Sequence, residues 1–164
     1  MVQRLLHTMI NIDFKIVKPT DRQALLLIAG WYFSEWHIPV EATIENLHSV
    51  TSDKDQCQIL MLVDGIPVST GGIYNHVGLL DKVPGLKIYK KWLGLVYTIP
   101  SERGKGYGAG ICHYIREHSR SLGIEKLHLF TDTAASLYRR LGWAEIERMT
   151  VNNRKIVVME KMIC

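Results

Sequence analysis

The stretch from Leu95 to Gly110 constrains the fold more than any other part of the chain. An apolar, β-branched run ends at Pro100, glycine then occupies every second position from Gly104 to Gly110, and a helical apolar pattern begins near Tyr107. A strand that is followed by a helix returns to its sheet by a crossover, which makes the next strand parallel to the first. The sequence therefore predicts one parallel strand pair built around this glycine-rich turn.

The rest of the chain predicts antiparallel pairing. Asp64-Gly65 is a hairpin signal between two β-branched runs, and Gly71-Gly72 in the second run predicts a bulge or a close backbone approach. The expected strands are 14–17, 58–63, 66–74, 92–99, 127–130, 144–148 and 155–160, and the expected helices are 20–36, 41–49, 107–122 and 134–141. Residues 75–89 are predicted to be a loop. The predicted fold is a mixed α/β sheet, mostly antiparallel, with helices on both faces.

Length and composition indicate a single domain over residues 1–164, with residues 1–12 as an N-terminal extension. No stretch approaches the ~20 apolar residues of a membrane span, and the N-terminus lacks the pattern of a signal peptide. The three cysteines are far apart and show no metal-binding spacing, so we expect reduced thiols and no metal. The net charge of +4 is spread along the chain, so neither nucleic acid nor a membrane is an expected partner. We expect a cytoplasmic protein.

The glycine-rich turn is a candidate site for a phosphate or pyrophosphate. The first amides of a helix have no internal partners and lie at the positive end of its dipole, and Arg103 and Lys105 add two cations. The alternative is a tight turn whose glycines only relieve steric conflict. Gly104-x-Gly106-x-x-Ala109 also fits a relaxed dinucleotide fingerprint, but too few residues follow it for the remainder of that fold. No Gly-Lys-Ser/Thr follows, which excludes a P-loop.

Two segments resemble the GNAT superfamily of acetyltransferases. Pro-Ser-Glu-Arg-Gly-Lys-Gly-Tyr-Gly at 100–108 is similar to the family's cofactor motif, and the segment from Ala134 to Trp143 is similar to its later helix, which carries a tyrosine. The resemblance implies acetyl-CoA as cofactor and direct transfer of its acetyl group to a primary amine of a small molecule or peptide. A non-catalytic module that senses acyl-CoA is the alternative function.

The resemblance also implies roles for particular residues. The backbone of Val96, Tyr97 and Thr98 would bind the pantetheine arm, and the amide of Val96 or Tyr97 would polarise the thioester carbonyl. Backbone amides of the turn would hold the pyrophosphate; these belong to Arg103, Gly104, Lys105, Gly106, Tyr107 and Gly108. Tyr138 matches the tyrosine that protonates the departing thiolate as a general acid.

The acceptor side is less determined. The resemblance places acceptor specificity in the first helical region and in the loop before the cofactor strand, which gives Trp31, Glu35, His37 and Tyr74 as candidate substrate-binding residues. Glu35 is also a candidate catalytic base, and His37, His76 and ordered water remain alternatives. For each of these side chains a purely structural or solvated role is also open. A monomer and a homodimer are equally compatible with the sequence.

Overall fold

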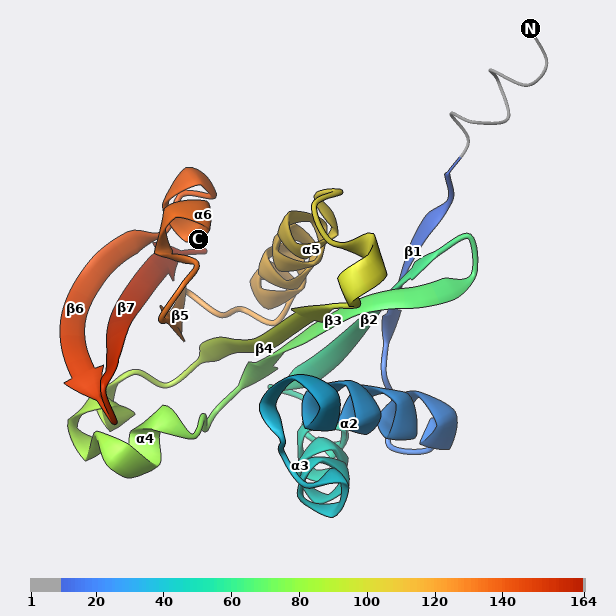
Figure 1. The fold of residues 1–164 in the computed structure, drawn as a ribbon, viewed down its shortest axis with the longest axis horizontal. Helices are drawn as coiled ribbons and strands as arrows, with labels where there is room; N and C mark the ends of the chain where they lie inside the picture. The colour runs from blue at the N-terminus through green and yellow to red at the C-terminus, as the bar shows by residue number, and fades with distance from the viewer. Residues whose placement is uncertain (1–9, 164) are drawn as a thin grey trace, which may run out of the picture.

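The computed structural model describes residues 10–163, which form one seven-stranded sheet covered by helices on both faces (Figure 1). The strand order is β1-β2-β3-β4-β5-β7-β6, and every neighbouring pair is antiparallel except β4–β5. The strands are β1 (Ile12–Ile16), β2 (Cys57–Val63), β3 (Ile66–Tyr74), β4 (Trp92–Thr98), β5 (Lys126–Thr131), β6 (Ala144–Val151) and β7 (Arg154–Met162). The predicted fold class, including its single parallel pair, is confirmed.

The helices divide between the two faces of the sheet (Figure 1). The helices are α2 (Arg22–Trp36), α3 (Val40–Ser52), α4 (Leu79–Lys82), α5 (Tyr107–Ser121) and α6 (Ala135–Arg140), with 3₁₀ turns η1 (Pro84–Ile88) and η2 (Pro100–Glu102). Helix α5 buries Ile111 and Ile115 in a core that includes Leu93. On the other face, α2 buries Ile28 and Tyr32 in a separate core. The period of the apolar residues along each helix thus decides which side it turns to the sheet.

The segment predicted as a loop, 75–89, contains α4 and η1. Its apolar residues Leu79, Leu80 and Leu86 are buried together with Trp92 in a third core. Helix α4 has only four residues, about one turn, so it carries no readable apolar period. This segment is therefore an ordered part of the face opposite α5.

Strands β4 and β5 meet over a single residue pair and then part. Trp92 is paired with His128, and the His128 N–H donates to the Lys91 carbonyl at 2.9 Å. Beyond this point β4 bulges, because Leu95 and Val96 both lie opposite Gly71, and Leu95 has a φ of 52°. The expected irregularity at Gly71-Gly72 is confirmed, although the extra residue belongs to β4.

Some expectations lie at or beyond the ends of the described chain. Most of the expected N-terminal extension, residues 1–9, and Cys164 fall outside it. Within residues 10–163, no helix combines the length and the apolar character needed to cross a bilayer.

Candidate functional site

The parting of β4 from β5 leaves one edge of β4 open. The Ile99 N–H donates to the carbonyl of Val68 on β3 at 2.9 Å. Tyr97, two residues earlier on β4, is the next residue whose backbone points toward β3. Backbone groups alternate along an antiparallel strand, so those of Val96 and Thr98 point away from β3 into the split. The structure therefore offers an extended ligand a strand edge at Val96 and at the N–H of Thr98, while the Thr98 carbonyl already accepts a hydrogen bond from Arg103.

This open edge leads directly to the glycine turn at the start of α5. Gly104 and Gly106 have φ angles of 78° and 85°, a left-handed conformation that favours glycine. The first helical bond runs from the Gly110 N–H to the Gly106 carbonyl at 3.0 Å, so the amides of residues 107–109 have no acceptor within the helix. These amides form a cradle suited to a phosphate or pyrophosphate.

The two cations of the turn are both held by the protein itself. The Arg103 side chain donates from Nε to the Thr98 carbonyl at 2.8 Å, and its Nη2 lies 3.2 Å from Oε2 of Glu35. The Lys105 ammonium lies 2.8 Å from Oε2 of Glu102, which raises the pKa of the lysine. From the sequence, both cations were expected to add positive charge at the anion site. In the structure each of them is paired with a carboxylate, and it is the backbone amides of residues 107–109 that have no acceptor within the helix.

Tyr138 extends from α6 toward α5, where its hydroxyl meets the thiol of Cys112. Its ring packs edge-on against Trp143, with ring centres 6.1 Å apart. Burial raises the pKa of Tyr138, and the neighbouring thiol raises it further. Burial also raises the pKa of Cys112 to about 12, so both groups are protonated at neutral pH. The phenol can donate a proton, while the thiol is a poor nucleophile.

The last turns of α2 bring aromatic and acidic side chains to the face of Tyr97. Trp31 and Trp36 lie with their ring centres 5.5 and 6.1 Å from that of Tyr97, and Glu35 reaches Arg103 beside the same ring. The structure therefore brings Trp31 and Glu35 together with the open strand β4. His37 is the exposed C-cap residue of α2.

Tyr74, by contrast, lies in the core. Its side chain is only 2% exposed, its hydroxyl donates to Oε1 of Gln58, and its ring packs against Gly72 and Gly94. A substrate cannot reach this tyrosine without rearrangement of the sheet. His76 is exposed and lies 3.2 Å from Oδ1 of Asp81, on the segment before α4.

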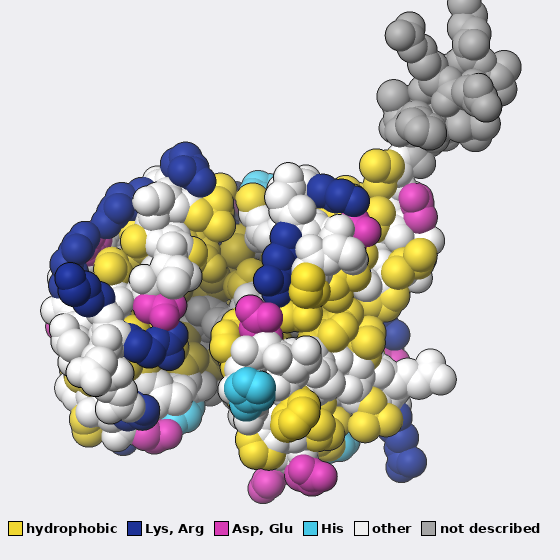
Figure 2. Space-filling view, in the orientation of Figure 1, with side chains coloured by type: hydrophobic (Ala, Val, Ile, Leu, Met, Phe, Trp, Pro, Cys, Tyr) yellow, Lys and Arg dark blue, Asp and Glu magenta, His cyan; other side chains and the backbone are white. Residues whose placement is uncertain are grey.

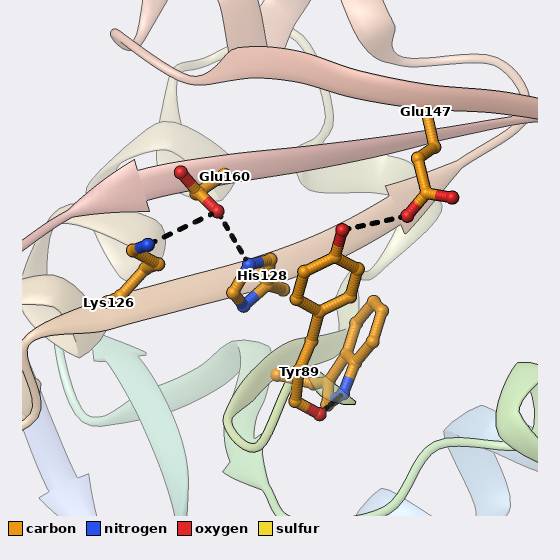
Figure 3. A network of polar contacts seen from close by, with 6 residues as sticks. Tyr89, Lys126, His128, Glu147 and Glu160 are labelled. Atoms are coloured by element: carbon orange, nitrogen blue, oxygen red, sulfur yellow. Dashed lines mark hydrogen bonds and ion pairs between the residues drawn. The ribbon is translucent and has the colours of Figure 1, made fainter. Parts of the chain in front are cut away.

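A polar network at the closed end of the split was not predicted from the sequence (Figure 3). His128 is 4% exposed, its Nε2 lies 2.9 Å from Oε2 of Glu160, and the Tyr89 ring stacks on it at 4.2 Å. The Tyr89 hydroxyl donates to Glu147 at 2.9 Å, and Lys126 lies 3.7 Å from Glu160. Burial lowers the pKa of His128, although Glu160 partly opposes this. The network ties the residue after η1 to β5, β6 and β7. Its only signal in the sequence was a histidine within an apolar strand.

The surface is hollowed between the half of the molecule that carries β6 and β7 and the half that carries α2. Hydrophobic side chains lie in this hollow (Figure 2). The sheet that parts at one strand pair, with a backbone anion cradle at the head of α5, forms a site for an extended ligand that carries a phosphate or pyrophosphate. Residues 58–145, more than half of the chain, match the family profile described as an acetyltransferase (GNAT) domain. The chain belongs to the GNAT acetyltransferase family.

Solved structures show the same fold at low sequence identity. An aminoglycoside 6′-N-acetyltransferase complexed with coenzyme A has a TM-score of 0.74 and 12% identity, with 93% of this chain and 97% of that chain covered. A GNAT-family acetyltransferase of Streptococcus pneumoniae has a TM-score of 0.71 and 16% identity, covering 94% and 100%. YncA of Salmonella typhimurium, solved with acetyl-CoA, has a TM-score of 0.70 and 12% identity, covering 93% and 94%. No curated protein sequence matches this chain significantly.

Proposed function

We propose that this protein transfers the acetyl group of acetyl-CoA to a primary amine of a small molecule or peptide. The observation that carries the proposal is the continuity between the open edge of β4 and the anion cradle of α5. An extended arm with a pyrophosphate at one end fits a strand edge that leads to uncommitted helix amides. Acetyl-CoA supplies the activated thioester when bound.

Backbone groups would hold this cofactor. The amides of residues 103–108 would bind the pyrophosphate, and the backbone of Val96 and the N–H of Thr98 would face the arm. The Val96 N–H is the better candidate for polarising the thioester carbonyl, because the Tyr97 backbone is directed toward β3. The buried Tyr97 ring would instead support Trp31 and Trp36 at the acceptor entrance.

Proton transfer would involve Tyr138 and the acceptor side of α2. Tyr138 is protonated at neutral pH and would donate to the departing thiolate as general acid. Direct attack by the amine needs no covalent intermediate on the enzyme, and the raised pKa of Cys112 argues against one. Glu35, held by Arg103, would accept the proton of the amine or orient the amine beside Trp31. His37 would lie at the edge of this entrance.

We also propose that the chain is a single domain that works in a reducing compartment. All seven strands belong to one sheet, which supports a single domain. Cys57 and Cys112 are free thiols, which is consistent with a reducing compartment such as the cytoplasm.

The test is release of free thiol from acetyl-CoA in the presence of a panel of primary amines, with mass spectrometry of the acetylated product. We expect release that depends on both protein and amine. Tight binding of CoA without release with any amine would instead support a sensing module. Absence of CoA binding by calorimetry would refute the cofactor assignment.

A further inference from the structure

A recess of about 180 Å³ lies on the sheet face opposite α5, between α4 and the turn that joins β6 to β7. Its apolar lining consists of Leu79, Phe130, Val151 and Ile156. Its polar rim consists of Lys82, Asn152 and Arg154. An apolar floor with a few polar groups at the rim is the usual make-up of a small-molecule subsite.

The position of this recess relates it to the split in the sheet. Phe130 lies on β5 two residues beyond His128, on the part of β5 that has already left β4, and its ring centre is 6.3 Å from that of Trp92. Side chains alternate along a strand, and Leu129 points into the core under α5. Phe130 therefore points to the other face. If the cofactor enters along α5, as the proposed function requires, an acceptor approaches from the side on which this recess opens.

The rim of the recess is cationic and built on a rigid turn. Asn152 and Asn153 have φ angles of 49° and 63°, the left-handed pair of a two-residue hairpin turn. This turn sets Arg154 at the rim, where its Nε donates to Oδ2 of Asp132 at 2.9 Å. Lys82 makes no ion pair with any residue between 10 and 163. The rim thus carries one positive charge more than its carboxylate neutralises.

Four carboxylates, at the acceptor entrance and on the segments around the recess, already have partners. Glu35 lies 3.2 Å from Arg103, Asp81 lies 3.2 Å from His76, and Glu147 accepts a hydrogen bond from Tyr89. Asp132 is held by Arg154. A polycationic acceptor needs several carboxylates to pair with its ammonium groups, and these four would have to give up existing partners. The charges favour an acceptor with a negative group.

We propose that the acceptor is an amine with an apolar body and an anionic group at its far end, and that this recess receives the far end with Lys82 and Arg154 at the anion. The inference rests on the proposed acetyl transfer and narrows its substrate class. It sets this chain apart from the aminoglycoside acetyltransferases that share its fold, because aminoglycosides are polycations.

The test compares matched acceptors in the thiol-release assay. Each member of a series of ω-amino carboxylates of increasing chain length is paired with the alkylamine of the same length, and kanamycin is included as the polycation. We expect kcat/KM for the best ω-amino carboxylate to exceed that of its alkylamine about tenfold, and the preference to weaken with added salt. Kanamycin should give no release above background.

A charge reversal at the rim then tests the recess itself. Lys82→Glu should raise the KM for the best ω-amino carboxylate about tenfold and leave the KM for acetyl-CoA unchanged. Lys155→Glu is the matched control, because Lys155 is an exposed cation next to Arg154 that does not line the recess, and it should retain the preference.

The outcomes separate the two proposals. Thiol release with alkylamines or kanamycin that equals or exceeds release with ω-amino carboxylates overturns the anionic acceptor and leaves acetyl transfer standing. If Lys82→Glu and Lys155→Glu lose the preference for the ω-amino carboxylate over the alkylamine equally, the role of the recess is overturned. Absence of release with every amine overturns both proposals.

Discussion

Replacing Tyr138 by phenylalanine removes one hydroxyl from the proposed site and little else. The hydroxyl contacts the Cys112 thiol, and the ring packs against Trp143. Loss of one weak polar contact should cost less than about 1 kcal/mol of folding free energy. For a domain of this size the melting temperature should fall by no more than about 2–4 °C. Any large kinetic effect would therefore be chemical.

The expected kinetic effect is a fall in kcat. A positioned general acid contributes about 10²–10⁴ in rate. The lower end applies here, because the raised pKa of Tyr138 makes it a weak acid and a thiolate with a pKa near ~8.5 leaves fairly well without help. We expect kcat to fall about 100-fold, which is ~2.7 kcal/mol of transition-state free energy, with the KM for acetyl-CoA within about twofold of wild type.

The pH profile gives an independent check with a definite sign. Tyr138 acts as its protonated form, and its pKa is raised above 10, so its contribution is complete at neutral pH and is lost only above pH 10 as the phenol ionises. The kcat of the wild-type protein should therefore not fall below pH 10 because of Tyr138 ionisation. The Tyr138→Phe variant should be slower by the same factor from pH 7 to pH 9.

Cys112→Ala is the control variant. It removes the thiol that contacts the hydroxyl and should leave kcat within a few-fold of wild type, because the thiol is buried and protonated. The reasoning is refuted if Tyr138→Phe turns over at the wild-type rate. It is also refuted if Cys112→Ala loses as much activity as Tyr138→Phe, since that would indicate disturbed packing between α5 and α6.

Further predictions concern packing, the acceptor side and the thiols. A Cβ at Gly72 would lie 2.5 Å from the Cys57 carbonyl oxygen, so Gly72→Ala should cost about 3 kcal/mol and lower the melting temperature by roughly 6–12 °C. Gly30→Ala, in the interior of α2 with nothing within 4 Å of the new carbon, should instead raise it by about 1–4 °C in the same scan. Glu35→Gln should raise the KM for the amine without changing the CoA dissociation constant measured by calorimetry, and its cost in stability should stay below about 1 kcal/mol because the ion pair is partly exposed. Burial raises the pKa of Cys57 to about 11 and that of Cys112 to about 12, so iodoacetamide at pH 8 should leave both unmodified in the native protein and alkylate both in guanidinium, as peptide mass spectrometry would show.

The sequence alone predicts those elements whose pattern extends over many neighbouring residues. The strand, glycine turn and helix around Pro100 and Tyr107 are each determined by neighbouring residues, and so the cradle was predictable to within a residue or two. Helix α4 was not, because four residues cannot show a helical period.

Contacts between distant residues could not be predicted in the same way. The engagement of Arg103 by Glu35 joins positions 68 residues apart, and the stacking of Tyr89 on His128 depends on how η1 folds over β5. The burial of Tyr74 follows from two glycines that make room for its ring, Gly72 on the same strand β3 and Gly94 on the neighbouring strand β4. Such contacts depend on strand register, which a single sequence does not specify.

The single pair between Trp92 and His128 also has a mechanical consequence. It divides the sheet into two blocks, β1–β4 and β5–β7, that are joined by one pair of strand residues. A cofactor lying along Val96 and Thr98 would fill the gap between the blocks, so that folding stability and occupancy become linked quantities. At a ligand concentration 100 times its dissociation constant, this linkage adds about 2.7 kcal/mol to the free energy of unfolding. Amide hydrogen exchange in β4 and β5 should then slow on binding more than exchange in β2, which is paired on both edges.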